Sequence, residues 1–143
     1  MVNINSDMLP QFYSRRLQSV LPETDYRQLL HHLDLCEQKR GPGWKFLAYV
    51  LHNKIVNTKS VAILPDCNIV TSDCKVTYQV NRGTPETGLL THRTRLDSRM
   101  PIIPISSLLG ATLIGMRIGQ RAPLINEEGS IHSLLVIDVA KEE

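Results

Sequence analysis

In the first part of the chain, hydrophobic positions recur with the period of an α-helix. Within residues 22–38 the apolar side chains return every three or four positions, at Tyr26, Leu29, Leu30, Leu33 and Cys36. Glu23, Thr24 and Asp25 place capping and acidic groups at the positive end of this helix. The pattern therefore predicts a helix that begins near Pro22.

A second helical pattern covers residues 43–56. One face holds Trp44, Leu47, Val50 and Leu51, and Ala48 and Ile55 extend it. The segment KRGPG between the two patterns breaks the helix with glycine and proline. Two helices around a short turn form an antiparallel helical hairpin, which we predict over residues 22–60.

After residue 59 the pattern changes to that of β-strands. We predict strands at 61–65, 75–80, 89–96, 121–125 and 130–139, the last two forming a hairpin around NEEG. Residues 81–88 form a turn-rich connection, and 101–105 carries two prolines, which suits an edge strand or a link. The fold class is α+β, with an N-terminal extension (1–21), a short helical hairpin (22–60) and a β-rich domain with one short helix (61–143).

The glycine-containing stretch at residues 106–124 predicts that short helix. Ser106 or Ser107 caps it, and its apolar residues (Leu108, Leu109, Leu113 and Ile114) pack inward. Gly115 suits the left-handed position after the helix end. Gly110 and Gly115 have phosphate-loop spacing, but Met116 and Arg117 replace the required Lys and Ser or Thr. The apolar run is also far shorter than the about 20 residues of a membrane span.

Composition and charge limit the function classes only weakly. The chain has 143 residues, of which 42% are hydrophobic, and a net charge of +2, which by itself does not indicate nucleic-acid binding. Residues 1–60 hold eight basic against five acidic residues, a mild positive bias. The three cysteines lack paired spacing, and residues 1–16 lack the apolar core of a signal peptide. We therefore expect a reduced, cytoplasmic protein.

Candidate catalytic groups are sparse. His31 and His32 are adjacent, so on a helix they point about 100° apart, and no histidine pair has the i, i+4 spacing of a helical metal site. No serine lies in G-x-S-x-G, although members of a Ser–His–Asp triad meet only in space, so a triad stays open. Asp34 and Glu37 could jointly hold a divalent cation, or could simply be solvated acids beside Lys39 and Arg40.

Several segments together resemble the GreA/GreB transcription elongation factor family, most closely its small Rnk members (regulator of nucleoside diphosphate kinase). The resemblance lies in Pro104–Gly110 with Ala111, Leu113, Ile114, Gly115 and Gly119, in IVTSDCKVTYQV (69–80), and in GSIHSLLVIDV (129–139). ETDYRQLLHHL (23–33) resembles the opening of the family's first helix, and residues 46–71 match a family segment in length. The resemblance covers residues 22–140.

This resemblance implies a fold and a partner. In the family an FKBP-like C-terminal domain docks on the rim of the RNA polymerase secondary channel, and an N-terminal antiparallel coiled coil enters the channel. Two carboxylates at the coiled-coil tip bring a metal to the polymerase active site for transcript cleavage. The matched positions Pro104, Ile105, Ser106, Ser107, Leu108 and Leu109 are then the expected polymerase contact. The alternative is that the leucines of this segment only fill the core.

Asp34 and Glu37 resemble the family's D-x-x-E tip carboxylates, but basic and helix-breaking residues (Lys39 to Pro42) follow them. A first helix of about 14 residues spans only ~21 Å, much less than a Gre arm. We therefore expect a non-enzymatic, monomeric regulator that binds polymerase without cleavage, has no catalytic or metal-binding residue and no cofactor, and meets nucleic acid only through the polymerase. The alternatives are an active cleavage factor using Asp34 and Glu37, and a prolyl isomerase. The isomerase would need an aromatic-lined pocket, and Tyr78 is the predicted domain's only aromatic residue.

Overall fold

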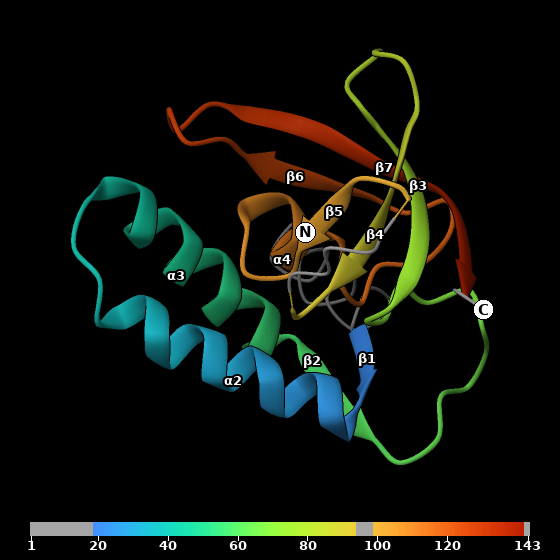
Figure 1. The fold of residues 1–143 in the computed structure, drawn as a ribbon, viewed down its shortest axis with the longest axis horizontal. Coiled ribbons are helices and arrows are strands. Elements are labelled where there is room, and N and C mark those ends of the chain that lie inside the picture. Colours follow the sequence, from blue (N-terminus) through green and yellow to red (C-terminus); the bar gives the residue numbers. More distant parts are fainter. Residues whose placement is uncertain (1–18, 94–98, 142–143) are drawn as a thin grey trace, which may run out of the picture.

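The computed structural model describes residues 19–93 and 99–141, which form two N-terminal helices beside a curled mixed sheet (Figure 1). The first four elements are β1 (Ser19–Pro22), α2 (Glu23–Glu37), α3 (Pro42–Val56) and β2 (Thr58–Val61). They are followed by β3 (Cys74–Val80), β4 (Glu86–Thr91), β5 (Ile102–Pro104), α4 (Leu108–Leu113), β6 (Arg121–Ile125) and β7 (Ile131–Lys141). The predicted α+β class is confirmed at this level.

Helices α2 and α3 form the predicted hairpin and run antiparallel in Figure 1. Gly41, with φ of 114°, supplies a left-handed turn conformation, and Pro42 starts α3 where its missing N–H is not needed. The inward faces differ from the prediction, because Leu30 and Trp44 are 45% and 42% exposed. The buried row of α2 instead runs through Asp25, Leu29 and Cys36, a helical repeat of one face that contains an acid.

Strand β1 precedes the hairpin and pairs in parallel with β2, which follows it. Its Leu21 is fully buried, so the end of the predicted N-terminal extension joins the core. The predicted strand at 61–65 is wrong, because the strand ends at Val61 and Ile63 is 85% exposed. Thr58–Val61 finds a partner in β1, whereas Pro65 has no N–H to donate to a sheet.

The main sheet has the strand order β5-β4-β3-β7-β6, with β4 and β5 parallel and the other neighbours antiparallel. It confirms the predicted strand at 75–80, the hairpin of 121–125 with 130–139, and the edge position of the proline-containing segment. The predicted strand 89–96 begins earlier and ends at Thr91, and residues 94–96 lie outside the described residues.

The hairpin and the sheet share one hydrophobic core. Leu29 and Leu51 of the hairpin, Leu113 of α4 and Val76 of the sheet are all fully buried in a single cluster. Burying each such side chain contributes roughly 1.5–3 kcal/mol relative to its exposure. Helix α4 lies between α3 and the sheet (Figure 1), and the Lys54 Nζ donates to the Thr112 carbonyl across that contact at 2.8 Å. The hairpin is therefore packed onto the rest of the protein.

Candidate functional site

The segment Pro104–Leu109 connects strand β5 to helix α4 and is held at both ends. The Ser107 hydroxyl donates to the Pro104 carbonyl at 2.6 Å and accepts from the Gly110 N–H at 3.0 Å. Ser107 is thus the helix N-cap, one of the two predicted capping residues, and Gly115 has the predicted left-handed conformation with φ of 86°. These bonds define the conformation of the segment.

Gly110 permits the close approach of α4 to this segment. A Cβ atom at this position would lie 1.9 Å from the Pro104 carbonyl oxygen and 2.8 Å from the Ile105 Cα. Both are backbone atoms, so only a residue without a side chain fits there. Gly110 therefore belongs to helix packing, in agreement with the rejection of a phosphate loop.

The predicted contact residues differ in exposure. Pro104 and Ser106 are exposed, and Ser107, Leu108 and Leu109 are half-buried. Ile105 is fully buried, so its side chain belongs to the core and cannot form a surface. Leu113 and Ile114 are also fully buried, as predicted. The half-buried leucines lie at the boundary between core and solvent.

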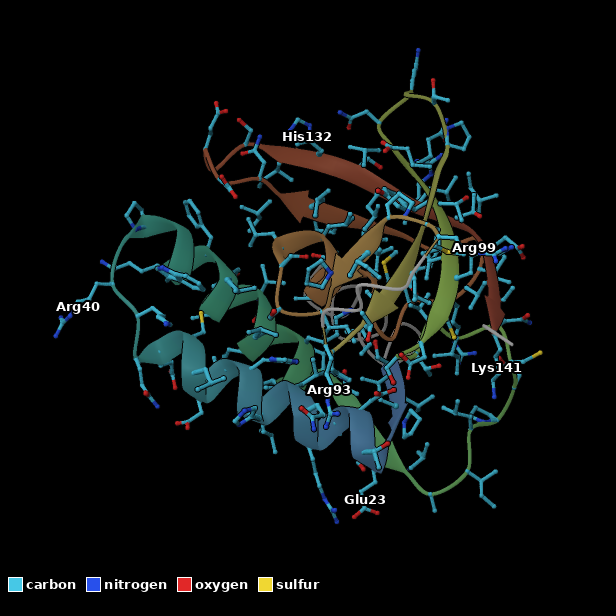
Figure 2. The ribbon with its side chains drawn as sticks, viewed as in Figure 1. Glu23, Arg40, Arg93, Arg99, His132 and Lys141 are labelled. Carbon is cyan, nitrogen blue, oxygen red and sulfur yellow. The ribbon has the colours of Figure 1, made fainter. Side chains whose placement is uncertain are left out.

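These leucines line an open groove of about 700 Å³, which we call the tip groove. One wall is Ser106–Leu109 at the start of α4, and another is residues 124–127 at the end of β6. The third wall comes from the hairpin turn and the start of α3, through Arg40, Gly41, Gly43, Trp44 and Leu47. Arg40 projects from the outer end of the hairpin in Figure 2. The structure thus joins the predicted contact segment to the hairpin tip.

The backbone of Trp44, near the start of α3, is held in place beside the hairpin turn. Its carbonyl accepts a hydrogen bond from the Cys36 thiol at 3.1 Å, and the Lys39 ammonium lies 5.8 Å from the centre of its ring. Burial raises the pKa of Cys36, and the charge of Glu37 raises it further, so the thiol stays a neutral donor. The tryptophan therefore presents its ring from a fixed backbone.

Asp34 and Glu37 are both exposed on α2 and do not line the tip groove. Within the described residues, no group of three or more His, Cys, Asp or Glu side chains is placed to hold a metal ion. In this part of the chain the two acids therefore have no third ligand beside them. Their assignment as tip carboxylates rests on sequence resemblance alone.

A buried polar network joins α2 to the sheet. The Asp25 Oδ1 lies 2.9 Å from the His92 Nε2, and the Asp25 Oδ2 accepts from the Ser72 N–H at 3.2 Å. The His92 Nδ1 lies 3.0 Å from the His32 Nε2, with the two rings nearly parallel at 22°. Asp25 is only 3% exposed. One hydrogen-bonded chain thus connects three segments that are far apart in sequence.

The pKa shifts of Asp25 and His32 agree with an ionised Asp25 beside a neutral His32. Burial opposes ionisation of Asp25, but the hydrogen bonds from His92 and Ser72 outweigh it, so the pKa of Asp25 is lowered. Burial, with the nearby His92 and His31, lowers the pKa of His32 to about 4. Because the Asp25–His92 pair ends on His32 instead of a serine, this pair does not form a Ser–His–Asp triad. It acts as a clamp.

Sequence reasoning missed both this network and the hairpin wall of the groove. Asp25 is four residues before Leu29 and seven before His32, so all three share one face of α2. The signal in the sequence was an acidic residue, Asp25, at helical spacing from the apolar residue Leu29. His92 and the hairpin wall of the groove gave none, because His92 is 60 residues from His32 and the hairpin wall is about equally distant in the chain from the start of α4.

The arrangement defines an α+β protein with a helical hairpin packed on a curled sheet and an apolar groove at the hairpin tip. Its fold is similar to that of a prokaryotic transcription elongation factor GreA/GreB from Nitrosomonas europaea, with a TM-score of 0.58 and 18% identity. The match covers 86% of this chain and 98% of that one. The resemblance to the GreA/GreB family is thus confirmed at the level of the fold.

The search of solved structures also finds Gfh1 (GreA factor homolog 1) of Thermus thermophilus, at 11% identity and a TM-score of 0.39, and Gfh1 of Thermus aquaticus, at 12% and 0.42. The first match covers 85% of this chain and 98% of that chain, and the second 86% and 98%. Comparisons with protein-family models and with curated proteins give no match. None of the described helices is long and apolar enough to cross a membrane.

Proposed function

We propose that this protein is a non-enzymatic transcription regulator that binds RNA polymerase at the rim of the secondary channel. The observation that carries the proposal is the tip groove, in which Ser106–Leu109 meet the hairpin turn in a chain with a GreA/GreB-like fold. The sheet domain would be the family's FKBP-like docking domain, and the hairpin a shortened form of its coiled coil. Rnk-like members of the family are the functional model that the sequence resemblance suggests.

The chemistry of the groove supports a protein partner. Leu47, Leu108 and Leu109 supply apolar surface, and Trp44 and Arg40 lie beside them. Tryptophan and arginine are enriched among residues that dominate binding energy at protein interfaces, particularly around an apolar pocket. A partner side chain that enters the groove would contact the hairpin and the sheet domain together.

The dimensions of the hairpin support binding without transcript cleavage. Each of its helices has 15 residues, or ~22 Å at 1.5 Å per residue. The hairpin also shares its core with the sheet, so it does not project as a free arm. Asp34 and Glu37 on a hairpin of this length would stay well short of a metal centre deep in the channel.

Competition with a GreA/GreB factor for purified RNA polymerase tests the proposal. The wild-type protein is expected to displace a labelled GreA/GreB factor, and the double variant Leu108→Asp with Leu109→Asp is expected to lose that ability. Ile63→Asp is the matched control, because Ile63 is 85% exposed and lies outside the tip groove. Displacement retained by the double variant, with its fold intact, would remove the tip groove as the contact.

A cleavage assay on backtracked polymerase complexes separates this proposal from the cleavage-factor alternative. We expect no shortening of the transcript by the wild-type protein. Shortening that Asp34→Ala or Glu37→Ala abolishes would establish the alternative and refute the reach argument. The same variants are expected to bind polymerase like the wild type, because both acids lie outside the groove.

A further inference from the structure

A second groove, of about 480 Å³, borders α3 beyond the tip groove, and we call it the root groove. Its walls include Tyr49, Val50 and Lys54 of α3 and Pro123, Ile125 and Ile131 of the β6–β7 hairpin. Ile125 lines both grooves, so the two lie next to each other along α3. The lining also includes polar residues (Ser19, Asn53, Asn57, Thr112 and Gln120). Tyr49 and Ile131 give the groove an accessible apolar part of its rim, being 57% and 69% exposed.

Lys54 is the cation in this lining. Its Nζ donates to the Thr112 carbonyl at 2.8 Å, which uses one of the three N–H groups of the ammonium. Among the described residues no carboxylate pairs with it, and burial lowers its pKa to about 8. Lys54 is half-buried, so its ammonium is partly removed from water without a counter-ion, and an incoming anion would relieve that cost.

The surrounding sequence supplies no such anion. Residues 38–65 contain five basic residues (Lys39, Arg40, Lys45, Lys54 and Lys59) and no Asp or Glu. Helix α3 itself carries Lys45 and Lys54 without an acid. This stretch is the most one-sided charge run in the described chain, and both grooves border it. Charge complementarity therefore favours an acidic partner surface.

We propose that the root groove is a second docking site, in which Lys54 pairs with a carboxylate side chain that an acidic–apolar segment of the partner protein presents. The apolar rim of Tyr49, Ile125 and Ile131 would contact the residues beside that carboxylate. The exposed apolar rim and the continuity with the tip groove favour a protein segment over a free small acid. The inference rests on the proposed function, since the partner would be RNA polymerase.

The test measures the affinity of the full chain for purified RNA polymerase, with a dye on the exposed thiol of Cys67. Lys54→Met keeps the length of the side chain and removes its charge. We expect binding to weaken about 30-fold, the scale for loss of one partner of a desolvated charge pair. Lys59→Met is the matched control, because Lys59 is exposed on β2 and lines neither groove, and its affinity should change by less than about twofold.

A second variant keeps the test decisive if Lys54→Met does not fold. Lys54→Gln is uncharged but retains an N–H donor for the Thr112 carbonyl, and it should lose affinity similarly. Tight binding by both uncharged variants, or equal loss in Lys59→Met, would overturn the root-groove inference while leaving the proposed function standing. Failure of the wild-type protein to bind polymerase would overturn both.

Discussion

The two helices of the hairpin have the same length but opposite surroundings. Helix α2 carries four acids against one arginine, and its inner face joins the Asp25–His92–His32 network. Helix α3 carries two lysines and no acid, and it borders both the tip groove and the root groove. Exposed apolar residues occur on both helices, Leu30 and Leu35 on α2 and Trp44, Tyr49 and Val56 on α3.

The difference shows that exposed apolar surface alone does not identify a binding face. Leu30 and Leu35 line neither groove, whereas Trp44 and Tyr49 each stand at the edge of one. The buried polar groups differ as well: on α2, Asp25 and His32 are paired within the protein, and on α3 Lys54 has no anionic partner among the described residues. We interpret α2 as the anchoring helix and, if the proposed function holds, propose α3 as the recognition helix, the helix that contacts the partner protein.

The largest expected effect concerns the Asp25–His92–His32 network that anchors α2. Asp25→Ala leaves His92 and the Ser72 N–H without their buried acceptor, so we expect a loss of about 3 kcal/mol in the free energy of unfolding. Chemical denaturation at neutral pH measures it. Asp34→Ala, at an exposed position on the same helix, should change stability by less than about 0.5 kcal/mol. Equal effects of the two variants would contradict the anchoring role of α2.

The next effect concerns helix α4, whose first residues form one wall of the tip groove. Gly110→Ala forces a Cβ onto the Pro104 backbone, so we expect about 2 kcal/mol of destabilisation and a displaced α4. Gly43→Ala is the control, because a Cβ there meets nothing within 4 Å and alanine favours the helix. Urea unfolding of both variants checks the pair. A Gly110→Ala protein as stable as wild type would show that α4 is free to move.

A binding comparison between the two helices follows. Trp44→Ala should weaken polymerase binding about 30-fold, because a tryptophan at a groove edge is a common source of interface energy. Leu35→Ala on α2, with a similar exposure of 44%, should leave the affinity within about twofold. Fluorescence titration with purified polymerase measures both. The recognition role of α3 would be lost if the leucine variant were the weaker binder.

The last expected effect is a pH dependence of the same network, which develops only as the pH falls below about 6.5. The pKa of His32 is about 4 in the folded protein and about 6.5 when unfolded, so the unfolded state binds the proton more readily. The stabilisation from neutral His32 is complete above pH 6.5 and is lost as the pH falls towards 4. Asp25, whose pKa is lowered, loses its contribution at still lower pH.

Unfolding free energies at several pH values between 7 and 4 test this dependence. His32→Gln can still donate to the His92 Nδ1 but does not titrate, so its stability should fall less steeply across that range. An identical slope for the variant and the wild type would place the acid sensitivity elsewhere in the molecule.

Local patterns predicted most of the elements, because helix and strand periods depend on neighbouring residues. They gave α2, α3, the capped α4 and the β6–β7 hairpin within a few residues. They failed where a distant partner decides the outcome. Strand β2 depends on β1, nearly 40 residues earlier, and His92 depends on Asp25 and His32. Of the predicted contact residues, Leu108 and Leu109 line the tip groove, whereas Ile105 is buried. Trp44 was predicted only as part of the apolar face of the second helix, and its place in the groove wall depends on the distant start of α4.

The contrast between the two helices can be measured directly by site-specific photo-crosslinking to RNA polymerase. A photoreactive amino acid replaces Tyr49 on α3 or Leu30 on α2, which are exposed by 57% and 45% and so tolerate the change. We predict a polymerase adduct from position 49 and none from position 30. Adducts from position 30 alone, from both positions equally, or from neither would contradict the assignment of α3 as the recognition helix.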